Sequence, residues 1–438
     1  MAALLLLLAV GLQPLSAAPT RPNVLYVVID DLRIDLPVYG QSQVHAPNLA
    51  RLAREGLVFD SAYCNQPVCS PSRNSFMSGR RPSTTQIWNF HGSFRDVGPA
   101  WTTLPGHFME HGFLTLGTGK LFHPGSPNNG DGSLSWSDAP GVQFVCNDSN
   151  VVGPPGTYCM PGAEGCRTAG TPGAPKPRWC SVDIPLNGST GNRTLADATT
   201  VADATAKLRY AAANLAATGQ PFFLGVGLQK PHLDFMMPAG FLELYPPNEQ
   251  TRVAKHPTAQ AGRPPVSIHC PYEGASFEKL WKGWGYTNPW TPMREVSAQQ
   301  MRRYYWAATS FMDYLVGQLL GEIEAAGLTP TTLVVFHSDH GWSLGENGDW
   351  LKFSLTELGT RVPLIIKAPH LPHAAGILDL GAMLTRVPRA SQPLPTTTTT
   401  HTCSSCSPHA DGCLQSSYSF SSFFLQADAP RPSSSWWT

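Results

Sequence analysis

Residues 23–31 read Asn-Val-Leu-Tyr-Val-Val-Ile-Asp-Asp, so a continuous apolar run ends in two carboxylates. Such a run is typical of a central strand in a parallel sheet, because helices cover both faces of that strand. Further strands are predicted at residues 113–119, 222–228, 332–337 and 362–366. Strands that alternate with helices predict an α/β fold, in which a large, mostly parallel sheet lies between layers of helices.

The predicted helices lie at residues 48–55, 102–111, 197–217 and 297–326, and a glycine follows each of them. Glycine adopts the left-handed conformation that ends many helices. In the last helix, apolar and aromatic residues recur at helical spacing, which indicates core packing.

Polar side chains follow four of the predicted strands: Asp30 and Asp31, Lys120 and His123, Lys230 and His232, and Asp339 and His340. Ligands of parallel α/β sheets bind beyond the carboxyl ends of the strands. One polar ending would mean little, since a strand-end Asp often caps the next helix, but four converging endings indicate a site. Asp30, Asp31 and Asp339 have the oxygen ligands that Ca²⁺ or Mg²⁺ prefers; the alternative is that they bind backbone amides.

Residues 69–73 read Cys-Ser-Pro-Ser-Arg, and residues 77–80 read Met-Ser-Gly-Arg. Ser70 is a favourable helix N-cap, and proline suits the first helical position. Cys69 is then expected at a helix N-terminus, where the helix dipole makes a thiol more acidic. Arg73 adds a charged fork suited to tetrahedral oxyanions. The alternative interpretation is a small buried cysteine beside a capped helix.

The composition of the 438-residue chain narrows the function classes, since its formal net charge is zero. A neutral chain argues against general binding to nucleic acid or to a membrane surface. Residues 1–18 are predicted to be a secretory signal peptide cleaved near Ala18, and no later run is long enough to span a bilayer. The ten cysteines, and glycosylation acceptors at Asn147, Asn187 and Asn192, fit the secretory pathway and disulfide formation.

Three regions are expected after the signal peptide. Residues 19–370 form the predicted catalytic domain, within which residues 124–192 are an irregular Cys-, Gly- and Pro-rich insertion that disulfides could hold together. Residues 371–438 are a divergent, Thr- and Ser-rich tail of low complexity, typical of a disordered or O-glycosylated segment.

The Cys-x-Pro-Ser-Arg motif with its nearby Gly-Arg resembles the signature of the formylglycine-dependent sulfatase family. Met-Ser-Gly-Arg departs mildly from the family's Leu-Thr-Gly-Arg. Further motifs most resemble the iduronate-2-sulfatase branch: Gly-Lys-Leu-Phe-His-Pro-Gly at 119–125, Lys-Pro-His at 230–232, and Ser-Asp-His-Gly-Trp-Ser-Leu-Gly-Glu at 338–346 with Trp350 and Lys352. The resemblance covers about residues 22–368 and implies the alkaline-phosphatase-like α/β sandwich, with the family's C-terminal subdomain apparently missing.

The resemblance implies a role for each matching residue. Cys69 would be converted to formylglycine by the formylglycine-generating enzyme, and the hydrated aldehyde would attack sulfur. Arg73, Lys120 and Lys352 would surround the sulfate, His123 would act as acid and base, and His232 would lie by the leaving oxygen. One Ca²⁺ ion would be bound by a further set: Asp30, Asp31, Cys69, Asp339 and His340.

By the same resemblance, the substrate would be the 2-O-sulfate of terminal iduronate in heparan or dermatan sulfate oligosaccharides, and the enzyme would be lysosomal or secreted. Two alternatives stay open. One is a truncated, non-catalytic sulfatase-like protein that binds sulfated glycans. The other is a phosphodiesterase of the related superfamily, since phosphate and sulfate esters fit similar sites. The Cys-x-Pro-x-Arg sequence argues against the second alternative.

Overall fold

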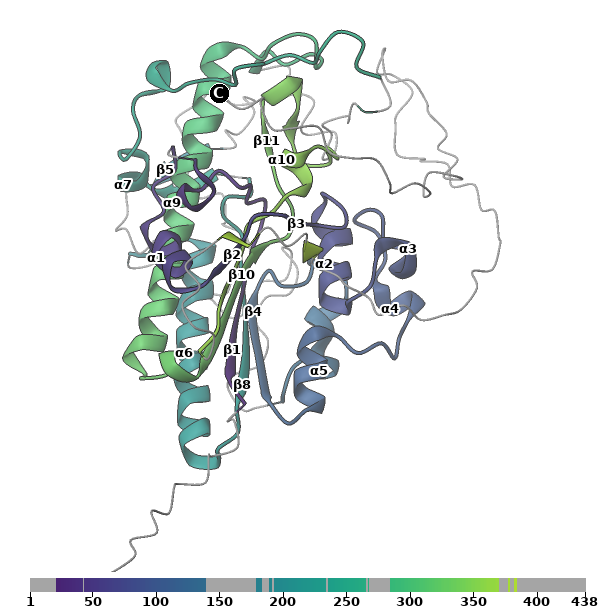
Figure 1. Ribbon diagram of the computed structural model, residues 1–438, viewed down its shortest axis with the longest axis vertical. Helices are drawn as coiled ribbons and strands as arrows, with labels where there is room; N and C mark the ends of the chain where they lie inside the picture. The colour runs from purple at the N-terminus through teal and green to yellow at the C-terminus, as the bar shows by residue number, and fades with distance from the viewer. Residues whose placement is uncertain are drawn as a thin grey trace, which may run out of the picture. The chain divides into compact units, whose positions relative to one another are not determined.

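The computed structural model describes residues 21–41, 43–138, 179–182, 189–190, 193–233, 235–264, 267, 284–369, 377–378 and 382–383 (Figure 1). The predicted signal peptide, most of the insertion at 124–192, the three glycosylation acceptors and nearly all of the tail lie outside these residues. Among the helices that are described, none is long and apolar enough to cross a membrane.

A seven-stranded sheet forms the centre of the described part. In spatial order its strands are β14 (Ile377–Leu378), β2 (Leu57–Phe59), β13 (Leu364–Lys367), β10 (Thr332–Ser338), β1 (Asn23–Ile29), β8 (Phe222–Leu228) and β4 (Leu114–Gly119). The four strands from β10 to β4 are parallel neighbours, and β14 is parallel to β2. Only β13 pairs antiparallel, with both β10 and β2. The predicted α/β class with a mostly parallel sheet is confirmed.

Helices cover both faces of this sheet, as the apolar run of β1 requires (Figure 1). One face is covered by α1 (Pro47–Glu55), α6 (Ala196–Thr218) and α9 (Glu295–Ala325). The other is covered by α2 (Cys69–Ser78), α3 (Pro82–Thr85), α4 (Phe94–Val97) and α5 (Leu104–Glu110). Alternate residues of β1 enter different cores, Leu25 and Val27 on the α9 side and Val24 and Tyr26 on the α2 side.

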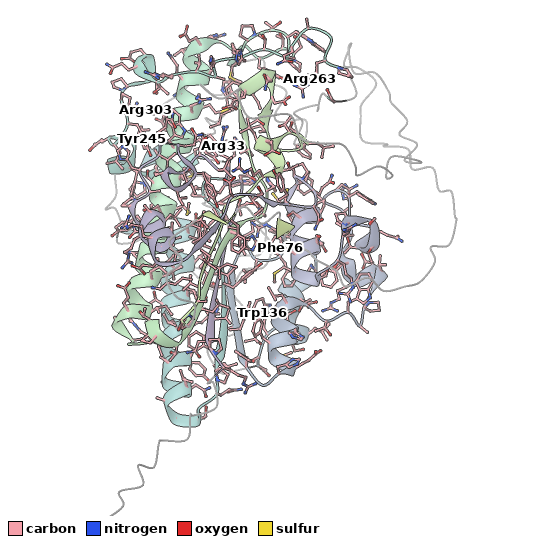
Figure 2. All side chains as sticks on the ribbon, viewed as in Figure 1. Arg33, Phe76, Trp136, Tyr245, Arg263 and Arg303 are labelled. Atoms are coloured by element: carbon pink, nitrogen blue, oxygen red, sulfur yellow. The ribbon has the colours of Figure 1, made fainter. Side chains whose placement is uncertain are left out.

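The two cores are filled by different kinds of side chain, and Figure 2 labels Phe76, Trp136 and Tyr245 among them. Phe76 and Trp136 belong to the core on the α2 side, where aromatic rings predominate. On the other side, Tyr245 packs beside α9 and hydrogen-bonds to Ser310 at 2.6 Å. The long helix α9 therefore contributes the core stripe that the sequence predicts, including Tyr305 and Phe311.

Shorter elements connect these layers: η1 (Pro37–Tyr39), β3 (Ala62–Tyr63), η2 (Asn128–Leu134), β5 (Trp179–Val182), β6 (Ser189–Thr190), β7 (Arg193–Thr194), β9 (Phe235–Pro238), α7 (Ala239–Leu242), η4 (Asn248–Gln250), η6 (Thr329–Thr331), β11 (Ser343–Leu344), η7 (Glu346–Gly348), β12 (Trp350–Leu351), α10 (Glu357–Thr360) and β15 (Ala382–Met383). The hairpin of β11 and β12 and the loop after it follow β10, at the edge where the parallel strands end.

The helix that contains the cysteine motif begins two residues earlier than the sequence predicts. Cys69 is its first residue and Val68 is the N-cap, in an extended conformation and without a side-chain hydrogen bond, so the predicted Ser70 cap is wrong. The N–H of Ser72 donates to the carbonyl of Val68 at 3.0 Å, which shows that the helical bonds already start there. Gly79 ends the helix with φ +67°, as predicted.

Candidate active site

Side chains from β1, β4, β8, β10, the start of α2 and the β12 loop meet at one end of the sheet. The carboxyl ends of the four parallel strands lie side by side there, and each strand places a predicted site residue at that edge. Arg73, Asp30, Asp31, Asp339 and His340 are fully buried. Cys69, Lys120 and Lys352 are also buried, whereas His123 and His232 are partly exposed.

Three carboxylates, a thiol and an imidazole form the centre of the site. Ligand atoms of Asp30, Cys69, Asp339 and His340 all lie within 4.8 Å of one another, and so do those of Asp30, Asp31, Cys69 and His232. The two sets share Asp30 and Cys69, so they describe one possible metal centre. The two sets together contain every predicted metal ligand (Asp30, Asp31, Cys69, Asp339 and His340) and add His232; that these residues bind a metal stays a prediction.

The orientation of His340 fits a cation at this centre. Its Nδ1 lies 2.9 Å from the carbonyl oxygen of Gly341, which assigns the ring hydrogen to Nδ1. Nε2 then presents a lone pair toward Asp31 Oδ1 at 3.3 Å and Asp339 Oδ2 at 3.6 Å. An imidazole lone pair and carboxylate oxygens that converge in this way suit a metal ion, and the predominance of oxygen suits a hard one.

The two aspartates on either side of Arg73 differ in protonation. Burial raises the pKa of Asp30, but the neighbouring charges, first that of Lys120, whose Nζ lies 2.5 Å from Asp30 Oδ2, and also that of Arg73, together outweigh burial and hold this pKa well below its ordinary value. Burial raises the pKa of Asp339 to about 7; Arg73 opposes the rise and the Asp30 carboxylate adds to it. A divalent cation among these oxygens would favour the ionised form of Asp339.

Arg73 holds the acidic cluster together instead of pointing to open space. Its Nε donates to Asp339 Oδ2 at 2.9 Å and its Nη2 to Asp30 Oδ1 at 3.2 Å. Its Nη1 donates to the carbonyl oxygens of Lys120 and of Leu121, the latter at 3.1 Å. In this structure the guanidinium group of Arg73, which the sequence predicts to contact sulfate, is instead hydrogen-bonded to two carboxylates and two backbone carbonyls. Arg73 therefore holds Asp30 and Asp339 in position.

Lys352 is the cation that contacts Cys69 directly. Its Nζ lies 3.0 Å from Cys69 Sγ, 3.4 Å from Asp31 Oδ1 and 3.2 Å from His232 Nε2. The residues on either side of it, Leu351 and Phe353, have φ values of +67° and +78°. Side chains other than glycine rarely adopt such angles, so backbone strain accompanies the placement of this lysine.

The thiol of Cys69 is not acidic, which corrects the prediction from its helix position. Burial raises the pKa of Cys69 well above its ordinary value, and the Asp30 carboxylate raises it further, while Lys120 and Lys352 oppose the rise. The loss of contact with water and the nearby carboxylates both disfavour a thiolate, and together they have a larger effect on the pKa than the helix dipole has. A buried thiol of this kind is a poor nucleophile.

Both site histidines of the predicted acid–base pair are neutral. Burial, with the charges of Lys120 and Arg73, lowers the pKa of His123 to about 3. Burial, with the charge of Lys352, lowers the pKa of His232 well below its ordinary value. The Nδ1 of His123 lies 3.0 Å from the carbonyl oxygen of Pro124, and the Nδ1 of His232 contacts that of Leu233. In both rings Nε2 is therefore the acceptor.

Supporting residues that the sequence did not single out fix the site residues in place. Tyr305 Oη donates to the carbonyl oxygen of Asp31 at 2.8 Å and accepts from the N–H of Arg33 at 3.0 Å, around an Asp31 backbone with φ +60°. Asp197 accepts from the N–H groups of Gln229 and Lys230, both at 2.8 Å. Helical spacing placed Tyr305 in the core, and an acidic residue in a first helical turn is too common to be a signal.

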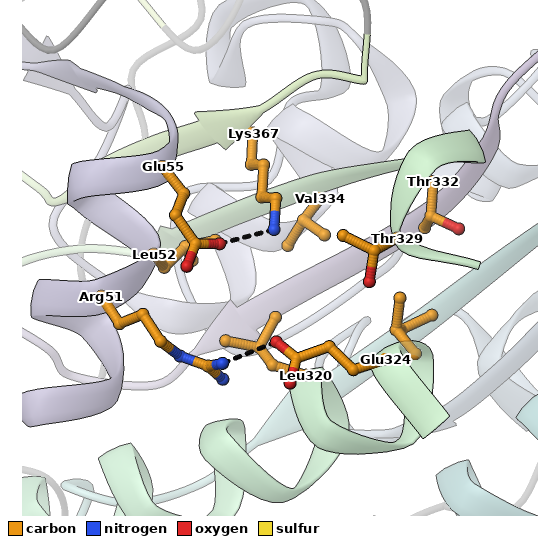
Figure 3. A pocket seen from close by; sticks show the side chains of 10 residues that line it. Arg51, Leu52, Glu55, Leu320, Glu324, Thr329, Thr332, Val334 and Lys367 are labelled. Atoms are coloured by element: carbon orange, nitrogen blue, oxygen red, sulfur yellow. Dashed lines mark hydrogen bonds and ion pairs between the residues drawn. The ribbon is translucent and has the colours of Figure 1, made fainter. Parts of the chain in front are cut away.

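A cavity at the opposite end of β10 is not part of this site (Figure 3). It lies beside Thr332 and has a volume of about 10 Å³, room for about one water molecule. Two ion pairs cross it, Arg51–Glu324 and Lys367–Glu55, each at 2.6 Å.

Comparisons with known proteins agree with the motifs and the fold. The family model described as Sulfatase matches residues 22–402, further along the chain than the predicted resemblance. Iduronate 2-sulfatase of Homo sapiens is 35% identical over 349 residues, which are 79% of this chain and 60% of the relative. Choline-sulfatase of Rhizobium meliloti is 26% identical over 362 residues, which are 80% of this chain and 63% of that protein. The chain spans about 60% of the length of the iduronate 2-sulfatases that it matches.

Solved structures show the same fold. A 2-O GAG sulfatase superposes with a TM-score of 0.56 at 18% identity, covering 83% of this chain and 68% of that one. The phosphonate monoester hydrolase of Agrobacterium radiobacter superposes with a TM-score of 0.57 at 17% identity. The superposition covers 83% of this chain and 72% of the hydrolase chain.

Proposed function

This chain belongs to the sulfatase family, and from that premise we propose that it hydrolyses a sulfate ester at the site around Cys69. The position of Cys69 is the observation that supports this most: its Sγ lies within 4.8 Å of the possible metal ligands and 3.0 Å from Lys352 Nζ. Residue 69 thus lies between the proposed cation site and the ammonium group of Lys352. Since its thiol is a poor nucleophile, we propose that Cys69 acts after conversion to formylglycine by the formylglycine-generating enzyme.

The proposed reaction has two covalent steps. One hydroxyl of the hydrated aldehyde attacks sulfur as its proton passes to the carboxylate of Asp31, whose Oδ1 lies 3.8 Å from Cys69 Sγ. The bond from sulfur to the sugar oxygen breaks, and that oxygen takes a proton from protonated His232. Water later takes the proton from Asp31 and restores the one on His232. His123 then removes the proton of the second hydroxyl, the bond from carbon to the sulfate oxygen breaks, and the aldehyde reforms as sulfate leaves. Water rehydrates the aldehyde. A bound Ca²⁺ would supply Lewis-acid polarisation of the reacting oxygens.

The scheme needs one histidine that can accept a proton and one that can donate a proton. His123 is neutral with Nε2 as acceptor, so it can act as a base at acidic or neutral pH. An anionic ester bound beside His232 would raise the pKa of this imidazole, because a neighbouring negative charge favours the charged form. His232 would then hold the proton that the leaving oxygen needs.

The charges of the site favour a substrate with two negative charges. When Asp339 is ionised, as a bound divalent cation would favour, the three carboxylates of Asp30, Asp31 and Asp339 are paired with three cations of equal total charge: Arg73, Lys120 and Lys352. A divalent cation would leave a surplus of two positive charges. A sulfate ester and a uronate carboxylate on one sugar would balance that surplus.

We therefore propose terminal 2-sulfated iduronate of heparan or dermatan sulfate as the substrate, with Ca²⁺ as the ion and the lysosome or the extracellular space as the location. The iduronate 2-sulfatases that the chain matches support the sugar, and the overlap of the two ligand sets in one centre favours this reaction over two-metal phosphodiester hydrolysis.

The test is desulfation of a 2-sulfated iduronide by protein produced in cells that install formylglycine, next to a Cys69→Ala variant. We expect sulfate release by the wild type and none by the variant. Folded wild-type protein that releases no sulfate would instead support the non-catalytic alternative. Cleavage of a phosphodiester to a phosphomonoester and an alcohol, in preference to sulfate release, would support the second alternative.

A further inference from the structure

An exposed aromatic ring stands beside the proposed acid–base residue and takes no part in the scheme above. Phe90 is 37% exposed, and its ring centroid lies 5.2 Å from that of His123 and 6.3 Å from that of Phe353. Phe353 directly follows Lys352. Two loops, one before α4 and one after β12, thus place aromatic rings next to two residues of the proposed active site.

Two further apolar side chains close to these rings in the sequence are exposed. Trp88 is 54% exposed and Leu355 is 77% exposed, each two residues away in sequence from one of the paired phenylalanines. Large apolar side chains gathered at the surface beside a polar site are typical of ligand contacts, because water solvates them poorly.

Phe90 also lines a cleft that includes none of the proposed catalytic or metal-binding residues. Its volume is about 510 Å³, within the range of roughly 300–1,000 Å³ usual for ligand sites. Phe90 and Gly125 line it at the end nearest His123, and η2 contributes further lining residues, including Leu134, which is 57% exposed. The cleft therefore shares Phe90 with the ring contact to His123, and Gly125, two residues after His123, also lines it.

The charged residues of this cleft are bound to one another. Arg95 donates from Nε and Nη2 to the two carboxylate oxygens of Asp131, at 2.7 and 2.6 Å, and from Nη1 to two backbone carbonyls. Asp96 accepts from the N–H of Ser93 at 2.7 Å. Arg95 is the one basic residue among the described lining residues, and Asp131 neutralises it, so this part of the cleft is not built to bind a sulfate.

We infer that Phe90 and Phe353 form a second sugar subsite for the sugar that follows the sulfated residue. The Phe90 ring stacks on the apolar face of that sugar, and the Phe353 ring, which is nearly perpendicular to it at 86°, contacts the edge of the sugar. The cleft then holds the next part of the oligosaccharide. Sugar rings present C–H groups on their faces and hydroxyls at their edges, so an aromatic ring can bind them without charge. The inference rests on the proposed function and names the part of the substrate that the charged site does not contact.

The kinetic test compares two substrates: a methyl glycoside of 2-sulfated iduronate, and a disaccharide in which a hexosamine follows that residue. We expect Phe90→Ala to lower kcat/KM for the disaccharide about fivefold or more while changing the value for the methyl glycoside less than twofold. Phe90→Trp keeps a stacking ring and should retain activity on the disaccharide. Tyr210→Ala, which removes an equally exposed ring from α6 on the other face of the sheet, should change neither value.

An equal loss on both substrates would overturn the inference, since Phe90 would then act only through His123. No loss on either substrate would also overturn it. If Phe90→Ala does not fold, the inference is tested with Phe90→Ser and Phe90→Trp. The kcat/KM values of these two variants must then differ for the disaccharide and agree for the methyl glycoside.

A binding measurement separates this inference from the proposed reaction. The disaccharide is titrated into Cys69→Ala protein with and without Phe90→Ala, by calorimetry, at low and at high salt. We expect the second substitution to weaken binding about fivefold or more and by the same factor at both salt concentrations, because stacking is uncharged. Unchanged binding would overturn the subsite even if the enzyme is active. Weakened binding would support it even if wild-type protein releases no sulfate.

Discussion

Asp197 is expected to control catalysis through the position of His232, although it touches neither the sulfate site nor the reacting atoms. It is buried in the first turn of α6, and its two oxygens accept from the N–H groups of Gln229 and Lys230 at 2.8 Å. Residues 229–232 form a turn, in which the N–H of His232 donates to the carbonyl oxygen of Gln229 at 2.7 Å. Lys230 Nζ donates to the carbonyl oxygen of His232 at 3.0 Å.

Asp197→Asn keeps the shape of the side chain but replaces one acceptor oxygen with an NH₂ group, which faces a backbone N–H. One buried donor then loses its partner, which costs about 1–3 kcal/mol. Burial raises the pKa of Asp197, so relief from burying its charge offsets part of that cost. We expect a free energy of unfolding about 2 kcal/mol lower, and a kcat lower by about 10- to 100-fold with little change in KM, since a displacement of about 1 Å can cost roughly 100-fold.

The assay is steady-state desulfation alongside urea denaturation, with Asp203→Asn as the matched control. Asp203 lies on the same helix and pairs with buried Lys207 at 2.6 Å, so its loss should lower stability but leave kcat within about twofold of wild type. The positioning account is refuted if Asp197→Asn loses stability while kcat stays within twofold, or if both variants lose kcat equally.

Three further predictions follow from buried charges. Burial alone would raise the pKa of Glu346, but Arg33 and Arg302 hold this pKa at about 2, below the ordinary 4.5. The ionised carboxylate therefore stabilises the fold fully above about pH 4.5, and this stabilisation is lost as the pH falls through 2. In urea titrations, the stability advantage of the wild type over Glu346→Gln should be roughly 2 kcal/mol smaller at pH 3 than at pH 6, and a constant difference would contradict this. Chelation of divalent ions should lower Tm and activity together, with both restored by Ca²⁺; a Tm insensitive to chelator and Ca²⁺ would argue against the metal centre. Asp313 accepts from the first N–H groups of α1, including that of Leu49 at 2.7 Å, so Asp313→Ala should destabilise the fold by about 2 kcal/mol in chemical denaturation, and a loss below about 0.5 kcal/mol would contradict that role.

The sequence predicts the middle of the sheet well because its central strands are rich in apolar residues. β1 and β8 have the predicted bounds, and their carboxyl ends place Asp30 and His232 at the expected edge. The antiparallel direction of β13 could not be predicted in this way, since a short apolar run has the same pattern in either direction. Strand order likewise depends on contacts between distant residues.

The grouping of the site residues is predictable, but their states are not. Spacing and resemblance bring Cys69, Lys120 and Asp339 together, whereas the raised pKa of Cys69 follows from burial among carboxylates that only the fold creates. The engagement of Arg73 with Asp30 and Asp339 is also invisible to the sequence, because a motif fixes a residue type and not the direction of its side chain. The roles of these residues in catalysis stay predictions.

The most direct test of the central claim, that a hydrated formylglycine at position 69 takes up and then expels sulfate, is mass spectrometry of the peptide that contains residue 69 after incubation with a 2-sulfated iduronide. A serine has one hydroxyl and cannot expel sulfate by reforming an aldehyde. The account predicts that Cys69→Ser protein retains one sulfate on Ser-substituted position 69 and stops after one turnover, while wild-type protein bears formylglycine there and turns over repeatedly. Repeated turnover by Cys69→Ser or Cys69→Ala, or an unmodified thiol in fully active wild-type protein, would contradict it.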